Sequence, residues 1–116
     1  MESKFLMLGD LNSYCISFGL SNYVWGVVVN WDNFSKITVG KQFVRSVDSI
    51  SANTAEGFGR YNKKDKIKFY RYSFGSVKES LDWNQKAFSR NLINKQAHSH
   101  IYHELDKMPK RDKFIN

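Results

Sequence analysis

Apolar residues recur at helical spacing through the middle of the chain. Five positions are separated by four, four, three and four residues: Val39, Phe43, Val47, Ile50 and Thr54. This spacing predicts an amphipathic helix, because side chains three and four residues apart lie on the same helix face. Ser35 is its predicted N-cap, and Gly57 and Gly59 mark its predicted end.

A longer stripe follows. Asn62 is its predicted N-cap, and Asp65 lies three residues on, near the positive end of the helix dipole. The apolar positions of this stripe are Ile67, Tyr70, Phe74, Val77, Leu81 and Phe88. Residues 91–94 are the predicted connection to a last helix. The inward positions of that helix are Ile101, Leu105 and Met108. Pro109 is expected to end or bend it.

The segment before residue 32 is ambiguous. Five of its residues again have the spacing of a helix stripe: Ile16, Leu20, Val24, Val27 and Trp31. However, residues 24–29 are rich in valine, which favours strands, and Gly19 and Gly26 weaken a helix. The residues alone leave a helix and a buried strand equally open.

Taken together, the stripes predict one all-α domain over residues 1–116, in which four antiparallel helices joined by short loops form a bundle. Residues 1–11 show no periodicity and are the predicted N-terminal arm. Residues 109–116 are the predicted basic C-terminal tail. A chain of 116 residues has room for one such domain and little else.

Positive charge is the most informative feature of the composition. The chain has 18 Lys and Arg residues against 11 Asp and Glu residues, a formal net charge of +7. A basic surface favours polyanions because their binding releases counterions, so RNA or DNA is a candidate partner. Surplus lysine that keeps a small protein soluble is the alternative.

The cations concentrate after residue 59, where they alternate with aromatic residues. Those predicted to contact phosphate are Arg60, Lys63, Lys64, Lys66 and Lys68. Arg71 continues the stretch, and the rings between the cations are Tyr61, Phe69, Tyr70 and Tyr72. Cations that meet phosphate and rings that stack on bases are typical of nucleic-acid binding. An amphipathic helix with a solvated lysine face explains the same residues equally well.

Candidate catalytic chemistry is sparse. One cysteine, Cys15, excludes an internal disulfide and a cysteine zinc cluster. We expect neither enzymatic activity nor a cofactor, because the sequence has no nucleophile elbow and no Walker-type phosphate loop. No stretch approaches the roughly 20 apolar residues of a membrane span, and the start of the chain lacks the pattern of a signal peptide. The sequence therefore predicts a cytoplasmic protein without a membrane partner.

A metal site is the alternative for the last helix. His100, His103 and Glu104 lie at positions i, i+3 and i+4, which share one helix face. Their spacing differs from that of a metalloprotease, and no fourth ligand is evident. Polar histidines on a helix surface are the simpler interpretation, so we expect no bound metal.

Two linked motifs carry a family resemblance. The first comprises Gln42, Arg45, Ser49, Ile50, Asn53, Ala55, Glu56, Gly57, Gly59 and Arg60. The second comprises Lys64, Asp65, Phe69, Gly75, Ser76 and Glu79. In this order they resemble the four-helix-bundle family often encoded in intervening sequences of 23S ribosomal RNA genes and labelled "S23 ribosomal protein". The resemblance covers roughly residues 14–108, with departures at Ser51, Thr54 and Pro109.

The resemblance implies an up-and-down four-helix bundle that assembles into a homopentamer, and it resolves the first segment as a helix. It also implies a motif surface where the second and third helices meet. Its residues are Asn53, Glu56, Gly57, Gly59, Gly75, Ser76 and Glu79. The leading hypothesis is a non-enzymatic homo-oligomer that binds RNA or DNA through its basic surface. The rival hypothesis is a protein-interaction scaffold with no nucleic-acid ligand.

Overall fold

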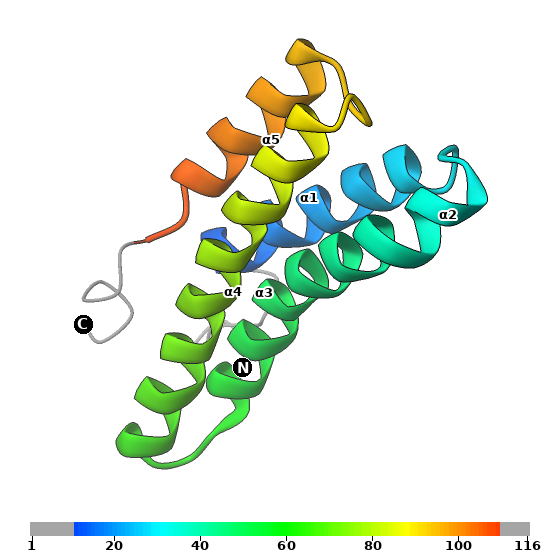
Figure 1. The fold of residues 1–116 in the computed structure, drawn as a ribbon. Helices are drawn as coiled ribbons and strands as arrows, with labels where there is room; N and C mark the ends of the chain where they lie inside the picture. Colours follow the sequence, from blue (N-terminus) through cyan, green and yellow to red (C-terminus); the bar gives the residue numbers. More distant parts are fainter. Residues whose placement is uncertain (1–10, 110–116) are drawn as a thin grey trace.

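The computed structural model describes residues 11–109, and all regular structure in this range is helical (Figure 1). The elements are α1 (Asn12–Val28), α2 (Asn33–Ser35), the π-helical turn η3 (Lys36–Gly40), α3 (Lys41–Gly59), α4 (Lys63–Ser89) and α5 (Lys95–Asp106). Because α2, η3 and α3 follow one another without a break, they form one rod, and residues 11–109 form four rods. The predicted N-terminal arm and C-terminal tail lie outside the described residues, apart from Leu11 and Pro109.

The four rods pack as an antiparallel bundle. Helix α1 packs against α3, α3 against α4, α4 against α5, and α5 against α1. The buried apolar residues between them form one core: Leu20, Val24, Val28, Val39, Phe43, Val47, Ile50, Val77, Ala87, Ile93, Ile101, Leu105 and Met108. The predicted all-α up-and-down bundle is confirmed. The first segment, for which the residues left a strand open, is a helix.

Side-chain caps fix three of the helix starts. The carboxylate of Asp32 accepts a hydrogen bond from the backbone amide of Ser35 at 3.1 Å. Ser35 therefore lies inside the second rod, and its prediction as the N-cap is wrong. The prediction for Asn62 is confirmed, because its Oδ1 accepts from the amide of Asp65 at 3.0 Å. Asn94 caps α5 in the same way.

Small polar residues bring α3 and α4 together. The buried residues of α4 are Ser73, Val77, Ser80, Asn84 and Ala87, whereas most of the larger predicted stripe is only half-buried. The hydroxyls of Thr54 and Ser73 lie 2.9 Å apart, and that of Ser80 donates to Ser46 at 3.1 Å. Because serine occupies little space, the two backbones approach closely along this seam while their hydroxyls satisfy one another.

The α3–α4 hairpin projects beyond α5. Helix α4 has 27 residues and α5 has 12, about 40 Å against 18 Å at 1.5 Å per residue. The end of α5 is level with the middle of α4, because Asp106 lines one small cleft with Phe74 and Lys78. The first turns of α4 and the loop before it therefore form the free tip of the hairpin, at the lower end of the green rods in Figure 1.

Candidate nucleic-acid interface

The tip of the hairpin carries the densest charge of the described chain. Residues 60–71 contain six basic side chains and one acidic side chain, Asp65. The five cations predicted to contact phosphate all lie in this segment. The structure divides them into two groups. Arg60 and Lys66 form an ion pair or hydrogen bonds within the chain, whereas Lys63, Lys64 and Lys68 face solvent and form no ion pair within the described part of the chain.

Arg60 is engaged within the chain. Its guanidinium forms an ion pair with the carboxylate of Glu56 one turn earlier. The same guanidinium lies over the ring of Phe69, 4.5 Å from the ring centroid. These contacts tie the end of α3 to the start of α4, and Glu56 offsets the positive charge at this point.

Lys66 is also engaged. Its ammonium donates to the carbonyl oxygen of Phe58 at 3.0 Å and to that of Gly57 at 3.4 Å. Those carbonyls belong to the last turn of α3, where a helix leaves acceptors without intrahelical partners and where a cation is favourable. Lys66 therefore stabilises the end of α3, which leaves its charge less available to a ligand.

The remaining predicted cations face solvent, and two further cations on α4 lie on the same exposed side. The exposed side of α4 carries four cations at steps of four, three and seven residues: Lys64, Lys68, Arg71 and Lys78. We call these residues the α4 basic face. They span 14 residues, or about 21 Å along the helix. Lys63 is exposed as well, but lies one position off this line. The sequence-based site had left out Arg71 and Lys78, which helical spacing alone would have found.

Aromatic side chains accompany the basic face. Tyr72 is 51% exposed, and together with Lys64, Asp65, Ile67, Lys68 and Arg71 it lines a shallow depression of about 510 Å³. The ring of Tyr72 makes an edge-to-face contact with Phe69, at a centroid distance of 5.4 Å. Tyr61 lies in the loop before α4 and is fully exposed.

Among the predicted motif-surface residues, Gly57 has the clearest structural role. A Cβ at Gly57 would lie 2.6 Å from Cε1 of Tyr70, so only glycine allows this approach of α3 to α4. The same packing partly buries Tyr70, and this burial raises the pKa of its phenol. By contrast, nothing lies within 4 Å of a Cβ built at Gly59 or Gly75.

Two other motif-surface residues, Asn53 and Glu79, make hydrogen bonds within their own helices. The amide of Asn53 donates to the carbonyl of Ser49 at 2.9 Å. Glu79 is exposed and accepts a hydrogen bond from the indole of Trp83 at 3.2 Å. Ser76 is half-buried.

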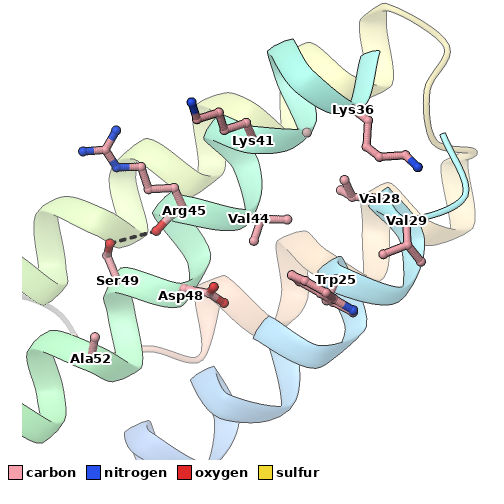
Figure 2. A pocket seen from close by; sticks show the side chains of 11 residues that line it. Trp25, Val28, Val29, Lys36, Lys41, Val44, Arg45, Asp48, Ser49 and Ala52 are labelled. Atoms are coloured by element: carbon pink, nitrogen blue, oxygen red, sulfur yellow. Dashed lines mark hydrogen bonds between the residues drawn. The ribbon is translucent and has the colours of Figure 1, made fainter. Parts of the chain in front are cut away.

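A second surface is an apolar groove between α1 and α3. It has a volume of about 550 Å³ and is lined by Trp25, Val28, Val29, Lys36, Gly40, Lys41, Val44, Arg45, Asp48, Ser49 and Ala52. In Figure 2, Trp25 and Val44 border the open space, whereas the cationic ends of Lys41 and Arg45 point away from it. Trp25 is 59% exposed although its ring is apolar. The groove therefore offers apolar contact area that this chain alone leaves uncovered.

The histidines of α5 do not converge. The ring of His100 packs against Tyr23, the ring of His103 against Tyr102, and Glu104 accepts a hydrogen bond from Lys107. Over residues 11–109, no group of three or more His, Cys, Asp or Glu side chains is arranged to hold a metal ion. In the same range, no helix has both the length and the hydrophobicity that a bilayer crossing requires.

Comparison with known proteins places this architecture in one family. No curated protein matches the sequence. The family described as 23S rRNA-intervening sequence protein matches residues 9–111, which is most of the chain. The match includes all four rods, the hairpin tip and both predicted motifs. The chain therefore belongs to the 23S rRNA-intervening sequence protein family.

Proposed function

We propose that this chain is a cytoplasmic, non-enzymatic homo-oligomer that binds RNA or DNA through the α4 basic face. The observation that carries the proposal is the alignment of Lys64, Lys68 and Arg71 on the solvent side of a hairpin that projects from the bundle. Within the described residues, no salt bridge engages these three cations or Lys78. Their charges are therefore available to the phosphates of a ligand.

The salt dependence of binding follows from the number of these cations. Each phosphate contact with a single strand contributes about −0.7 to the slope of log K against log salt. Four contacts per protomer give a slope of about −3, which is a loss of roughly 50-fold in affinity between 50 mM and 200 mM salt. An oligomer that engages several protomers would show a steeper slope.

Self-association is the second part of the proposal, and the apolar groove supports it. Trp25 and Val29 are exposed beside the groove, and Phe34 and Ile37 on the neighbouring α2–η3 segment are 72% and 59% exposed. A chain that carries both an apolar protrusion and an apolar groove can join a second copy head to tail. Contacts of this kind close into rings when the rotation permits, as the expected pentamer would require. Tryptophan and phenylalanine are also the residues favoured at subunit interfaces.

An electrophoretic shift assay with labelled 23S ribosomal RNA fragments at low salt tests the function. We expect wild-type protein to shift the RNA and the triple variant Lys64→Glu, Lys68→Glu, Arg71→Glu to lose this activity. The matched control reverses three exposed cations elsewhere, Arg90→Glu, Lys95→Glu and Lys107→Glu, and has the same net charge.

The two triple variants separate a local site from a general charge effect. Binding by the control but not by the α4 variant supports the proposed face. Equal loss in both variants would mean that net charge alone drives association, and equal retention would overturn the face. A wild-type oligomer that shifts neither RNA nor DNA would support the rival scaffold function, with the groove open to a protein partner.

A further inference from the structure

The cations of the hairpin tip lie on one side of the exposed face of α4, and Tyr72 lies beside them. With each residue advancing about 100° around the helix, Arg71, Lys64 and Lys68 come first, and Tyr72 and Asp65 follow on the same solvent side. These residues line one depression, together with Ile67. One edge of the depression is therefore cationic, and the other edge presents a tyrosine ring and a carboxylate.

We propose that the ligand of this surface is single-stranded nucleic acid, with phosphates on the cationic edge and unpaired bases stacked on Tyr72 and Tyr61. This inference rests on the proposed function and names the class of ligand. It is more specific than the proposal of a basic surface, because a surface that recognises charge alone would bind duplexes as well as single strands.

Tyr72 has the position and the support that a stacking platform needs. Its ring is 51% exposed and is held at one edge by Phe69, at a centroid distance of 5.4 Å and an interplanar angle of 87°. Phe69 is held in turn by the guanidinium of Arg60 and the ammonium of Lys68, 4.5 Å and 5.6 Å from its centroid. The Arg60–Phe69 contact therefore positions Tyr72, which gives Arg60 a supporting role at this site.

Tyr61 supplies a second ring at the tip. It directly precedes Asn62, the N-cap of α4, and is fully exposed. A large ring left in water forgoes the stabilisation that burial of its apolar carbons would provide. Stacking on a base would remove much of that ring from water.

A duplex cannot use these rings. Its bases are already stacked on one another inside the helix, so a straight line of cations reaches only the phosphates of the backbone. Bases of a single strand have free faces, and their stacking on aromatic side chains is tolerant of sequence. Asp65 fits the same assignment, since a carboxylate repels phosphate but accepts hydrogen bonds from the amino groups of unpaired bases.

Fluorescence anisotropy with three labelled probes of about 16 nucleotides or base pairs tests the inference: oligouridine, oligothymidine and a mixed-sequence DNA duplex. We expect either single strand to bind at least tenfold more tightly than the duplex. Tyr72→Ala and Tyr61→Ala should each weaken single-strand binding about tenfold and leave duplex binding within about twofold. Tyr72→Phe should retain single-strand affinity, because it keeps the ring.

The matched control is Tyr102→Ala, which removes a tyrosine of similar exposure from α5. This variant should bind all three probes with wild-type affinity. Duplex binding as tight as single-strand binding, or unchanged single-strand affinity in both tyrosine variants, would overturn the inference while the basic face stands. Failure of all three probes to bind would overturn the proposed function itself, and this inference with it.

Discussion

Gly57 offers the most direct test of how the hairpin is held together. It is buried in the last turn of α3, and a Cβ there would lie 2.6 Å from Cε1 and 2.8 Å from Cδ1 of Tyr70. The carbonyl oxygen of Lys66 would lie 3.3 Å away. Real Cβ atoms do not tolerate the two shorter distances, so Gly57→Ala must displace the tyrosine ring or part the two helices.

Two opposing effects set the magnitude. Replacing glycine with alanine inside a helix raises the free energy of unfolding by about 1 kcal/mol. Forcing an extra methyl group into a packed contact costs about 1–3 kcal/mol. Since both the ring and a backbone oxygen confine the site, we expect Gly57→Ala to lower the free energy of unfolding by about 1 kcal/mol, a fall in Tm of roughly 4 °C.

The assay is urea unfolding followed by far-ultraviolet circular dichroism. Protein concentration is held constant, because the proposed self-association would make apparent stability concentration-dependent. Gly75→Ala is the matched control: it lies in the middle of α4 with nothing within 4 Å of its Cβ, and should raise stability by about 0.5–1 kcal/mol. In a Tyr70→Ala background the effect of Gly57→Ala should change sign. If Gly57→Ala stabilises the wild-type chain as much as Gly75→Ala does, the close approach at Gly57 is refuted.

Three further predictions concern the core, a helix cap and the groove. Asn84 is buried, and its side-chain amide donates to the carbonyl of His98 at 3.0 Å. Because Asn84→Asp would bury a charge without a counterion, it should lower the free energy of unfolding in urea by about 3 kcal/mol at neutral pH. An unchanged unfolding midpoint would contradict this contact. Hydrogen bonds from the side chain and then the backbone of Ser35 lower the pKa of Asp32. The stabilisation by this charged cap is therefore present above the ordinary carboxyl pKa, about 3.9, and is lost as the pH falls through the lowered value. Asp32→Asn should remove that acid-dependent loss. If the free energies of unfolding in urea of the variant and of the wild-type protein have the same pH profile, the charged cap makes no such contribution. Trp25→Glu should convert the proposed oligomer into folded monomers, as measured by light scattering. An unchanged mass would show that the groove is not the self-association surface.

The helices were largely readable from the sequence because their apolar stripes and side-chain caps are local signals. Asn62 and the spacing of Phe43, Val47 and Ile50 gave correct predictions without any tertiary information. The first segment was different, because its valines favour strands. Burial of Leu20 and Val24 in the common core overrides that local preference.

The buried face of α4 was less readable. Its most buried positions include Ser73, Ser80 and Asn84, which a hydrophobic pattern cannot mark as core. They are accommodated in the core because each makes a hydrogen bond to a hydroxyl or carbonyl oxygen on a neighbouring helix. Such pairings depend on how two helices meet, which the sequence of one helix does not contain.

The candidate site was likewise only partly predictable from the sequence. The concentration of cations between residues 60 and 71 is visible in the sequence, and so is their alternation with rings. The engagement of Arg60 with Phe69 and of Lys66 with the end of α3 depends on the geometry of the hairpin. These contacts shift the candidate phosphate contacts toward Arg71 and Lys78, further along α4.

The central claim, that the α4 basic face meets phosphate, is tested most directly by the slope of log K against log salt for a labelled oligouridine. Neutralising three cations in the variant Lys64→Gln, Lys68→Gln, Arg71→Gln should make the slope shallower by about 2, at −0.7 for each lost phosphate contact. A variant with the wild-type slope would show that these three side chains contact no phosphate.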